Sequence, residues 1–320
     1  MTAFVTANGL EIGYDVQGAG PPMVMLHGAS SAGREDFAAQ VPLFSRAFRV
    51  HLPDARGHAT TRWDASDGFV VDDLVADLLA FADALRLASF HLVGFSLGAM
   101  TALRFATRYP DRLRTLVVIG ISTEREPRTS VARRILDPRR IDRDDPTWAA
   151  ELGRRHDAVQ GSGAWGRLLD AVVADVATQP EVTPGELRRV ELPAMVVCGD
   201  RDPFTPVGQA WSLARQLPDA RLFVAPGCGH DVMVRRPALF NEAMSSFYRA
   251  TEEVARRRVS AMPTAFAAPA PPRAAPTTSD AGPDAALVDG TLAHPAGVPA
   301  AESNGEWLAH AGDAPGKADR

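Results

Sequence analysis

The chain has 320 residues, of which 46% are hydrophobic and 23% charged, and its formal net charge is −5. This length allows one large domain or two smaller ones, and the near-neutral balance excludes a strongly basic nucleic-acid surface. Two cysteines are too few for a secreted fold built on disulfides. No apolar run approaches the ~18 residues of a membrane span, and the N-terminus lacks the pattern of a signal peptide. We therefore expect a cytoplasmic protein without nucleic-acid or membrane partners.

Short apolar strands alternate with helical patterns over the first 121 residues. The strands are predicted at residues 3–6, 10–16, 23–26, 49–52, 90–93 and 116–119, with an Asn8-Gly9 hairpin turn between the first two. Helices are predicted at residues 37–48, 70–87 and 99–108. This alternation predicts an α/β fold with a mostly parallel central sheet and helices on both faces. Ligands then bind beyond the carboxyl ends of the strands.

The alternation stops at Ser122. Residues 122–190 are rich in Arg and Pro, and their clearest helical patterns are at 147–159 and 164–177. A segment of nearly 70 residues is longer than an ordinary crossover, so we expect a small helical cap inserted after the sixth strand. A pair of ordinary crossover helices is the alternative.

The chain then returns to the core and ends in a segment of different composition. Two strands are predicted at 194–198 and 222–224, and a closing helix at 237–251. The core is therefore expected to comprise residues 1–121 and 191–255. After Arg258 the chain is rich in Ala and Pro without periodicity. Such a composition buries too little apolar surface to offset its chain entropy, so we expect residues 256–320 to form a disordered tail.

The most informative stretch is Gly94-Phe95-Ser96-Leu97-Gly98, between a predicted strand and a predicted helix. It matches the G-x-S-x-G pattern, in which a sharp strand-to-helix turn exposes the serine. The flanking glycines remove side chains that would clash at such a turn. The helix N-terminus behind Ser96 favours negative charge, so this position suits a nucleophile whose transition state is an oxyanion.

A serine hydroxyl is a weak nucleophile at neutral pH, and it needs a base that is itself oriented by a third group. Asp200 and Asp202 follow the strand at 194–198, and His230 follows the strand at 222–224. Asp200 and Asp202 are alternatives, because alternate residues of a strand point the same way. By residue type alone, His27 and His58 are further candidates.

Five motifs occur in order along the chain. They are Leu26-His27-Gly28-Ala29, Asp54-x-Arg56-Gly57-His58, Gly94-x-Ser96-x-Gly98, Gly199-x-x-Asp202-x-x-x-Pro206 and Gly229-His230. Together they resemble the α/β-hydrolase superfamily, in its capped, esterase-like group, over residues 1 to about 250. The resemblance implies Ser96 as nucleophile, His230 as general base and then acid, and Asp202 as the group that orients His230. It also implies an oxyanion hole from the backbone N–H groups of Ala29 and Leu97, and loop-supporting roles for His27 and His58.

Some positions depart from the family pattern. Ala59 and Thr61 stand where a glycine and a serine are usual, and Ala99 stands where a second glycine is common. Serine at the nucleophile position counts against the epoxide-hydrolase and haloalkane-dehalogenase branches, which need a carboxylate there.

We therefore expect a serine carboxylesterase-type hydrolase that acts on small to medium acyl esters through an acyl-enzyme on Ser96. A small-molecule ester is the expected partner, and no cofactor or metal is expected. Enol-lactone hydrolysis, carbon–carbon bond hydrolysis and cofactor-free perhydrolysis would use the same triad. A small-molecule receptor of this fold is an alternative of another class.

Two further features have alternative interpretations. Seven arginines crowd the first part of the predicted cap: Arg125, Arg128, Arg133, Arg134, Arg139, Arg140 and Arg143. They form either a solvated surface or a cationic lining that favours acidic esters or an acidic carrier protein, since a guanidinium binds a carboxylate through two hydrogen bonds. Cys198 and Cys228 either pair across neighbouring strands or, as we expect, remain buried free thiols.

Overall fold

The computed structural model describes residues 2–260 of the chain. Eight strands form one sheet in the order β1-β2-β4-β3-β5-β6-β7-β8. The strands are β1 (Ala3–Ala7), β2 (Leu10–Gln17), β3 (Pro22–Leu26), β4 (Arg49–Pro53), β5 (Phe90–Phe95), β6 (Leu113–Ile119), β7 (Ala194–Gly199) and β8 (Ala220–Ala225). β2 pairs antiparallel with β1 and β4, and every other pair is parallel. The predicted mostly parallel α/β fold is confirmed.

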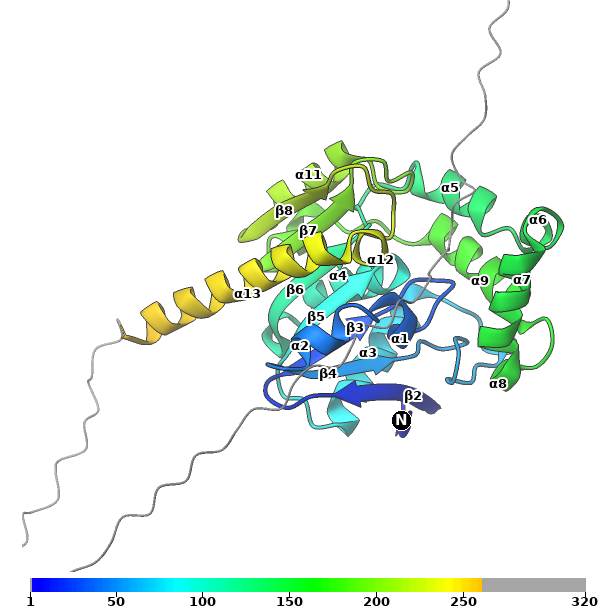
Figure 1. Ribbon diagram of the computed structural model, residues 1–320, viewed down its shortest axis with the longest axis horizontal. Coiled ribbons are helices and arrows are strands. Elements are labelled where there is room, and N and C mark those ends of the chain that lie inside the picture. The colour runs from blue at the N-terminus through cyan, green and yellow to red at the C-terminus, as the bar shows by residue number, and fades with distance from the viewer. Residues whose placement is uncertain (1, 261–320) are drawn as a thin grey trace, which may run out of the picture. The chain divides into compact units, whose positions relative to one another are not determined.

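Helices cover both faces of the sheet, which is why the central strands are almost wholly apolar. One face carries α1 (Gly33–Asp36), α2 (Val41–Phe44), α12 (Val232–Arg235) and α13 (Pro237–Ser260), and this face is turned to the viewer in Figure 1. The other face carries α3 (Val71–Ala84), α4 (Leu97–Arg108) and α11 (Val207–Gln216). Neighbouring residues of one strand point to opposite faces of the sheet. Met23 packs on the face that carries α2 and α13, and Val24 packs on the face that carries α3 and α4.

The predicted helix at 37–48 is wrong as a continuous element. The structure has only the short helix α2 within this stretch, and residues 37–40 separate it from α1, which ends at Asp36. Pro42 lies in the first turn of α2. Proline is favoured at a helix start but cannot continue a helix, because it lacks the N–H and its ring collides with the preceding turn. The apolar residues Phe37, Val41 and Phe44 are nevertheless buried against the sheet.

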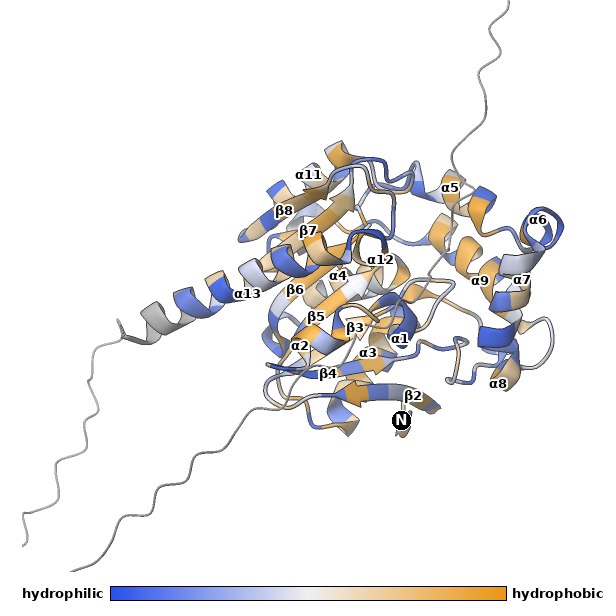
Figure 2. Cartoon of the chain, viewed as in Figure 1, coloured by the Kyte–Doolittle hydropathy of each residue, from blue (hydrophilic) through white to orange (hydrophobic). Residues whose placement is uncertain are grey.

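Helices α5 to α10 lie between β6 and β7, where the cap was expected. Their bounds are α5 (Arg128–Ile135), α6 (Pro138–Asp144), α7 (Pro146–Leu152), α8 (Ala158–Gln160), α9 (Ala164–Thr178) and α10 (Pro184–Leu187). A π-helical stretch, Gly153–Asp157, joins α7 to α8, so the predicted helix at 147–159 is three pieces. Figure 1 shows α5 to α9 beyond the ends of β5, β6 and β7. Figure 2 shows hydrophobic residues along β5 to β8 and hydrophilic ones on α6.

The C-terminal boundary differs from the prediction. α13 begins at Pro237, as expected, but ends at Ser260, so residues 256–260 belong to this helix and not to a tail. The rest of the predicted disordered tail, residues 261–320, lies outside the described residues. Cys198 and Cys228 are buried free thiols, as expected. Among residues 2–260, no helix combines the length and the apolarity needed to cross a membrane.

Candidate active site

Ser96 occupies a tight turn between β5 and α4. Its backbone has φ 51° and ψ −110°, a conformation that costs a non-glycine residue roughly 1–3 kcal/mol. Its N–H donates to the carbonyl of Ile119 on the neighbouring strand, at 2.9 Å. A β-carbon on Gly94 would lie 2.3 Å from the carbonyl oxygen of Gly98, and one on Gly98 would lie 2.3 Å from that of Leu26. The two glycines are thus required by close backbone packing, and the turn holds Ser96 half-exposed.

The N–H groups predicted to form an oxyanion hole belong to two residues, Leu97 and Ala29, that come from different segments of the chain. Leu97 is the first residue of α4, so its N–H has no acceptor within the helix. Ala29 lies in the loop after β3, and its carbonyl is 2.9 Å from Nε2 of His58. The N–H of Gly98 donates to the carbonyl of His27, which joins this loop to the start of α4. Both Leu97 and Ala29 line the pocket that contains Ser96.

His230 is paired with Asp202 and not with Asp200. Nδ1 of His230 lies 3.0 and 2.9 Å from the two carboxylate oxygens of Asp202, whose side chain is fully buried. Asp202 Oδ1 also accepts from the N–H groups of Phe204 and Thr205. Asp200 is exposed and accepts from the N–H of Cys228. Backbone N–H groups of Gly227 and Cys228 hold the pKa of Asp200 below its usual value.

The imidazole of His230 is held on several sides and has one free nitrogen. The ring of Phe204 stacks on it at 4.3 Å, and the ring of Phe95 lies at 5.0 Å. Nε2 of His230 is buried and has no hydrogen-bond partner among residues 2–260. His230 and Ser96 line the same pocket. The structure therefore brings together the five residues that the family resemblance implied for the site.

The ring nitrogens of His27 and His58 form hydrogen bonds with the backbone of neighbouring loops and are not available to a ligand. Nδ1 of His27 lies 2.7 Å from the carbonyl of Gly28, and its Nε2 accepts from the N–H of Ala55. Nδ1 of His58 lies 2.9 Å from the carbonyl of Arg56. Burial lowers the pKa of both rings to about 4, so both are neutral at physiological pH.

Another buried histidine, His156, was not singled out from the sequence. Its Nδ1 accepts from the N–H of Ala59, and its ring lies 5.4 Å from that of His58. His156 belongs to the π-helical stretch, which follows α7. No sequence motif marks this position, because the contact depends on how the helical segment packs against the loop at 54–61.

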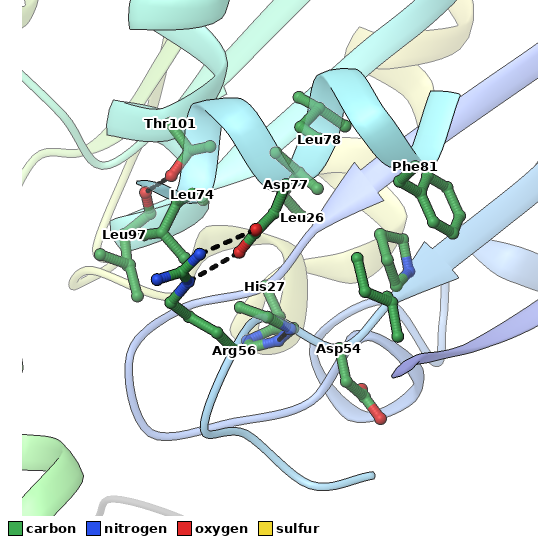
Figure 3. A pocket seen from close by; sticks show the side chains of 14 residues that line it. Leu26, His27, Asp54, Arg56, Leu74, Asp77, Leu78, Phe81, Leu97 and Thr101 are labelled. Carbon is green, nitrogen blue, oxygen red and sulfur yellow. Dashed lines mark hydrogen bonds and ion pairs between the residues drawn. The ribbon is translucent and has the colours of Figure 1, made fainter. Parts of the chain in front are cut away.

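Arg56, from the second motif, lines a different hollow from the one that contains Ser96. Its Nε and Nη2 donate to the two carboxylate oxygens of Asp77 at 2.7 and 2.8 Å (Figure 3). The pair lines a hollow of about 480 Å³, partly open to solvent, between α3 and the strands. Leu97 and Gly98 reach this hollow, but Ser96, Asp202 and His230 do not. Arg56 therefore stabilises the packing of its loop against α3.

The pocket that contains Ser96 and His230 has a volume of about 420 Å³, is partly open to solvent and is mainly apolar. Its apolar side chains come from α4, α5, α9 and the ends of strands, and include Met100, Ile121, Ala132, Leu136, Val172, Val176 and Phe204. Its other polar side chains are Arg128 and Gln179. Within residues 2–260, no three His, Cys, Asp or Glu side chains are arranged to hold a metal ion.

Comparison with known proteins places the chain in a family. Residues 23–243 match the sequence profile of the alpha/beta hydrolase family. The chain belongs to this family. It is 27% identical over 256 residues to the serine hydrolase BPHL of Homo sapiens, covering 77% of this chain and 86% of the relative. It is also 27% identical over 265 residues to the 2-hydroxy-6-oxo-2,4-heptadienoate hydrolase of Pseudomonas putida, covering 78% and 96%.

Solved structures agree with the fold. The meta-cleavage product hydrolase of Pseudomonas fluorescens IP01 superposes with a TM-score of 0.66 at 21% identity, covering 78% of this chain and 97% of that one. The predicted family and fold are confirmed, and the chain is a member of a family of hydrolases.

Proposed function

We propose that this protein is a serine hydrolase that cleaves carboxylic esters of small to medium acyl substrates through an acyl-enzyme on Ser96. One observation carries the proposal. His230 is held at Nδ1 by the buried carboxylate of Asp202, while its Nε2 is unpartnered and Ser96 lies in the same pocket. This is the arrangement that a nucleophile, a base and an orienting group require.

Asp202 sets the tautomer of the base. Its carboxylate can only accept a hydrogen bond, so Nδ1 of His230 carries the proton and Nε2 presents a lone pair. Nε2 then takes the hydroxyl proton of Ser96 as Oγ attacks the ester carbonyl. The developing imidazolium is stabilised by Asp202, which remains ionised.

The negative charge on the carbonyl oxygen is received by the N–H groups of Leu97 and Ala29 in this proposal. Leu97 adds the positive end of α4, which begins immediately after Ser96. His230 protonates the departing alcohol, and the alcohol leaves. His230 then activates a water that hydrolyses the acyl-Ser96 ester, which releases the acid.

We further propose that residues 122–190 act as a cap that shapes the acyl pocket. Ala132 and Leu136 of the α5 region and Val172 and Val176 of α9 all line the pocket that contains Ser96. Apolar side chains at these positions suit a hydrocarbon chain.

The test is a turnover screen over p-nitrophenyl esters of varied acyl length, with lactones and methyl esters alongside. We expect multiple turnover of at least one ester, and a Ser96→Ala variant should fall to a few per cent of wild type or less. Ser122→Ala is the matched control, since Ser122 is a buried serine that binds Gln209 and does not line the pocket. At most one turnover per protein would instead support the receptor alternative, and exclusive cleavage of lactones would support the lactonase alternative.

A further inference from the structure

Arg128 differs from the other arginines of its segment. Six of the seven that the sequence places there are exposed, whereas Arg128 is 9% exposed. It is the first residue of α5, and it lines the pocket that contains Ser96 and His230. The solvated-surface interpretation therefore holds for the six, and Arg128 alone lies in the pocket.

The guanidinium of Arg128 has no charged partner within 4.0 Å among residues 2–260. Its Nη1 donates to the side-chain oxygen of Gln179 at 3.1 Å, and its Nε is buried without a partner. The nearby carboxylate of Asp175 is engaged elsewhere. Its oxygens accept from the N–H of Val71 at 3.1 Å and from Nε2 of Gln179 at 2.5 Å.

The charged groups around Arg128 are two cations, Arg104 and Arg125, and one carboxylate, Asp175, so positive charge exceeds negative. Arg125 donates to the carbonyls of Ala177 and Gln179, and Arg104 donates to that of Pro180. The carbonyl groups of Ala177, Gln179 and Pro180, at and just after the end of α9, are thus already used by two other arginines. Burial and the charge of Arg104 lower the pKa of Arg128 to about 10, so it remains cationic at neutral pH.

A buried cation with one neutral hydrogen-bond partner is unfavourable unless an anion joins it. The pocket offers that place, because Arg128 and Gln179 are polar groups in an otherwise apolar lining next to Ser96 and His230. A ligand that fits is mainly apolar and carries a single negative charge. A carboxylate meets this description, since one guanidinium neutralises its charge through two parallel hydrogen bonds.

We propose that Arg128 binds a carboxylate of the substrate, so that the preferred esters are half-esters of dicarboxylic acids. The inference rests on the proposed function for the reaction at Ser96. Arg128 acts here as a specificity-determining residue, and Gln179 orients its guanidinium through the bond at Nη1.

The test compares pairs of activated esters that differ only in charge. Mono-p-nitrophenyl esters of straight-chain dicarboxylic acids, from succinate to pimelate, carry the carboxylate. The corresponding terminal amides are neutral esters of the same length. We expect the wild-type protein to give a higher kcat/KM for the carboxylate at one or more chain lengths. Arg128→Gln should lower the ratio of the two kcat/KM values by about 10- to 100-fold, the range for hydrogen bonds to charged groups.

Arg133→Gln is the matched control, because Arg133 lies on the same helix and is exposed. Its ratio should stay within about twofold of wild type. Guanidinium ion added to Arg128→Ala should restore part of the preference for the carboxylate ester. If Arg128 contributed only packing, the added ion would have no such effect. The inference is overturned if the wild-type ratio is near one at every chain length, or if Arg128→Gln leaves it unchanged.

Binding separates this inference from the proposed function. A free dicarboxylate such as glutarate or pimelate should raise the Tm of the wild-type protein and of Ser96→Ala, but not that of Arg128→Gln. If these Tm shifts were seen but no ester were hydrolysed, the proposed esterase activity would be refuted and the carboxylate site at Arg128 would still be supported. Tm shifts that are equal in wild type and Arg128→Gln would refute the site, whatever the esterase result.

Discussion

The backbone of Gly120 lies so close to His230 that a β-carbon at this position would come within 2.7 Å of Cε1 and 2.9 Å of Nδ1 of the imidazole. Gly120 follows β6 with φ +66°, and its N–H donates to the carbonyl of Val197 on β7. The sheet itself therefore forms one wall of the space that holds the ring. Phe204 stacks on the same ring, so His230 has little freedom to turn away from Asp202.

We predict that Gly120→Ala lowers kcat for ester hydrolysis at least about 100-fold, because the new methyl group must displace the imidazole. Gly9→Ala is the control: Gly9 has a similar φ of +75°, and a β-carbon there would meet nothing within 4 Å. The left-handed backbone costs each variant roughly 1–2 kcal/mol of stability, so Tm should fall in both. Activity should fall only in Gly120→Ala, and unchanged kcat in that variant would contradict the assigned position of the ring.

We predict that Asp202→Asn lowers kcat by roughly 10⁴-fold, because an amide can donate to Nδ1 and so favours the wrong tautomer. Asp200→Asn is the natural comparison. Asp200 binds the N–H of Cys228 and does not contact His230, so this change should cost only about 1 kcal/mol of stability. Should Asp200→Asn be the inactive variant, the pairing of His230 with Asp202 would have no catalytic meaning.

Most of the sheet and the turn at Ser96 could be predicted because local rules decide them. Met23, Val24 and Met25 form an unbroken apolar run, and all three are fully buried in β3. The two glycines around Ser96 leave space for a turn that admits no side chain at either position. In both cases the residue type is dictated by its immediate backbone, so the local sequence carries the signal. Asp202 and His230 are assigned only through the family resemblance, because Asp200 and Asp202 are alternatives by residue type.

Contacts between distant segments could not be predicted. Nothing in the sequence distinguishes Arg128 from Arg133 or Arg134, because burial depends on how α5 packs against α9. His156 meets Ala59 across 97 positions of sequence. Gly120 did offer a signal, since a glycine directly follows an apolar strand, but its neighbour His230 lies far along the chain.

His156 should make the protein less stable in mild acid. Its side chain is 1% exposed, and burial lowers its pKa from 6.5 to about 2. Between these values the unfolded chain binds a proton that the folded chain does not, so the stabilisation is present above pH 6.5 and is lost as pH falls. At about 1.4 kcal/mol for each pH unit, a fall to about pH 5 removes about 2 kcal/mol.

The matching variant is His156→Asn, whose amide oxygen can still accept from the N–H of Ala59 but does not titrate. Free energies of unfolding would be measured in urea at about pH 7.5 and about pH 5. The wild-type protein should lose about 2 kcal/mol more than the variant, since other shifted groups are common to both. Equal losses would show that His156 protonates as readily in the folded protein as in the unfolded chain.

The ion pair of Arg56 with Asp77 should matter for stability rather than for catalysis. Both side chains are 9% exposed and bonded through two contacts (Figure 3). Arg56→Met leaves the buried carboxylate of Asp77 without a cation, also removes the pair with Asp73, and should cost about 3–5 kcal/mol. Arg108→Met, which removes the more exposed pair with Asp72, should cost about 0–1 kcal/mol. Similar losses of Tm in the two variants would contradict this account.

The most direct test of the account is to detect the covalent intermediate. Intact-mass and peptide mass spectrometry would follow the protein after quenching during ester turnover, and after treatment with a fluorophosphonate that labels activated serines. We predict one acyl or phosphonyl group per chain, carried by Ser96, and none on Ser96→Ala. Asp202→Asn should acquire the group far more slowly than wild type, because its base is held in the wrong tautomer. Ester turnover with no adduct on Ser96, or labelling that persists in Ser96→Ala, would contradict the central claim.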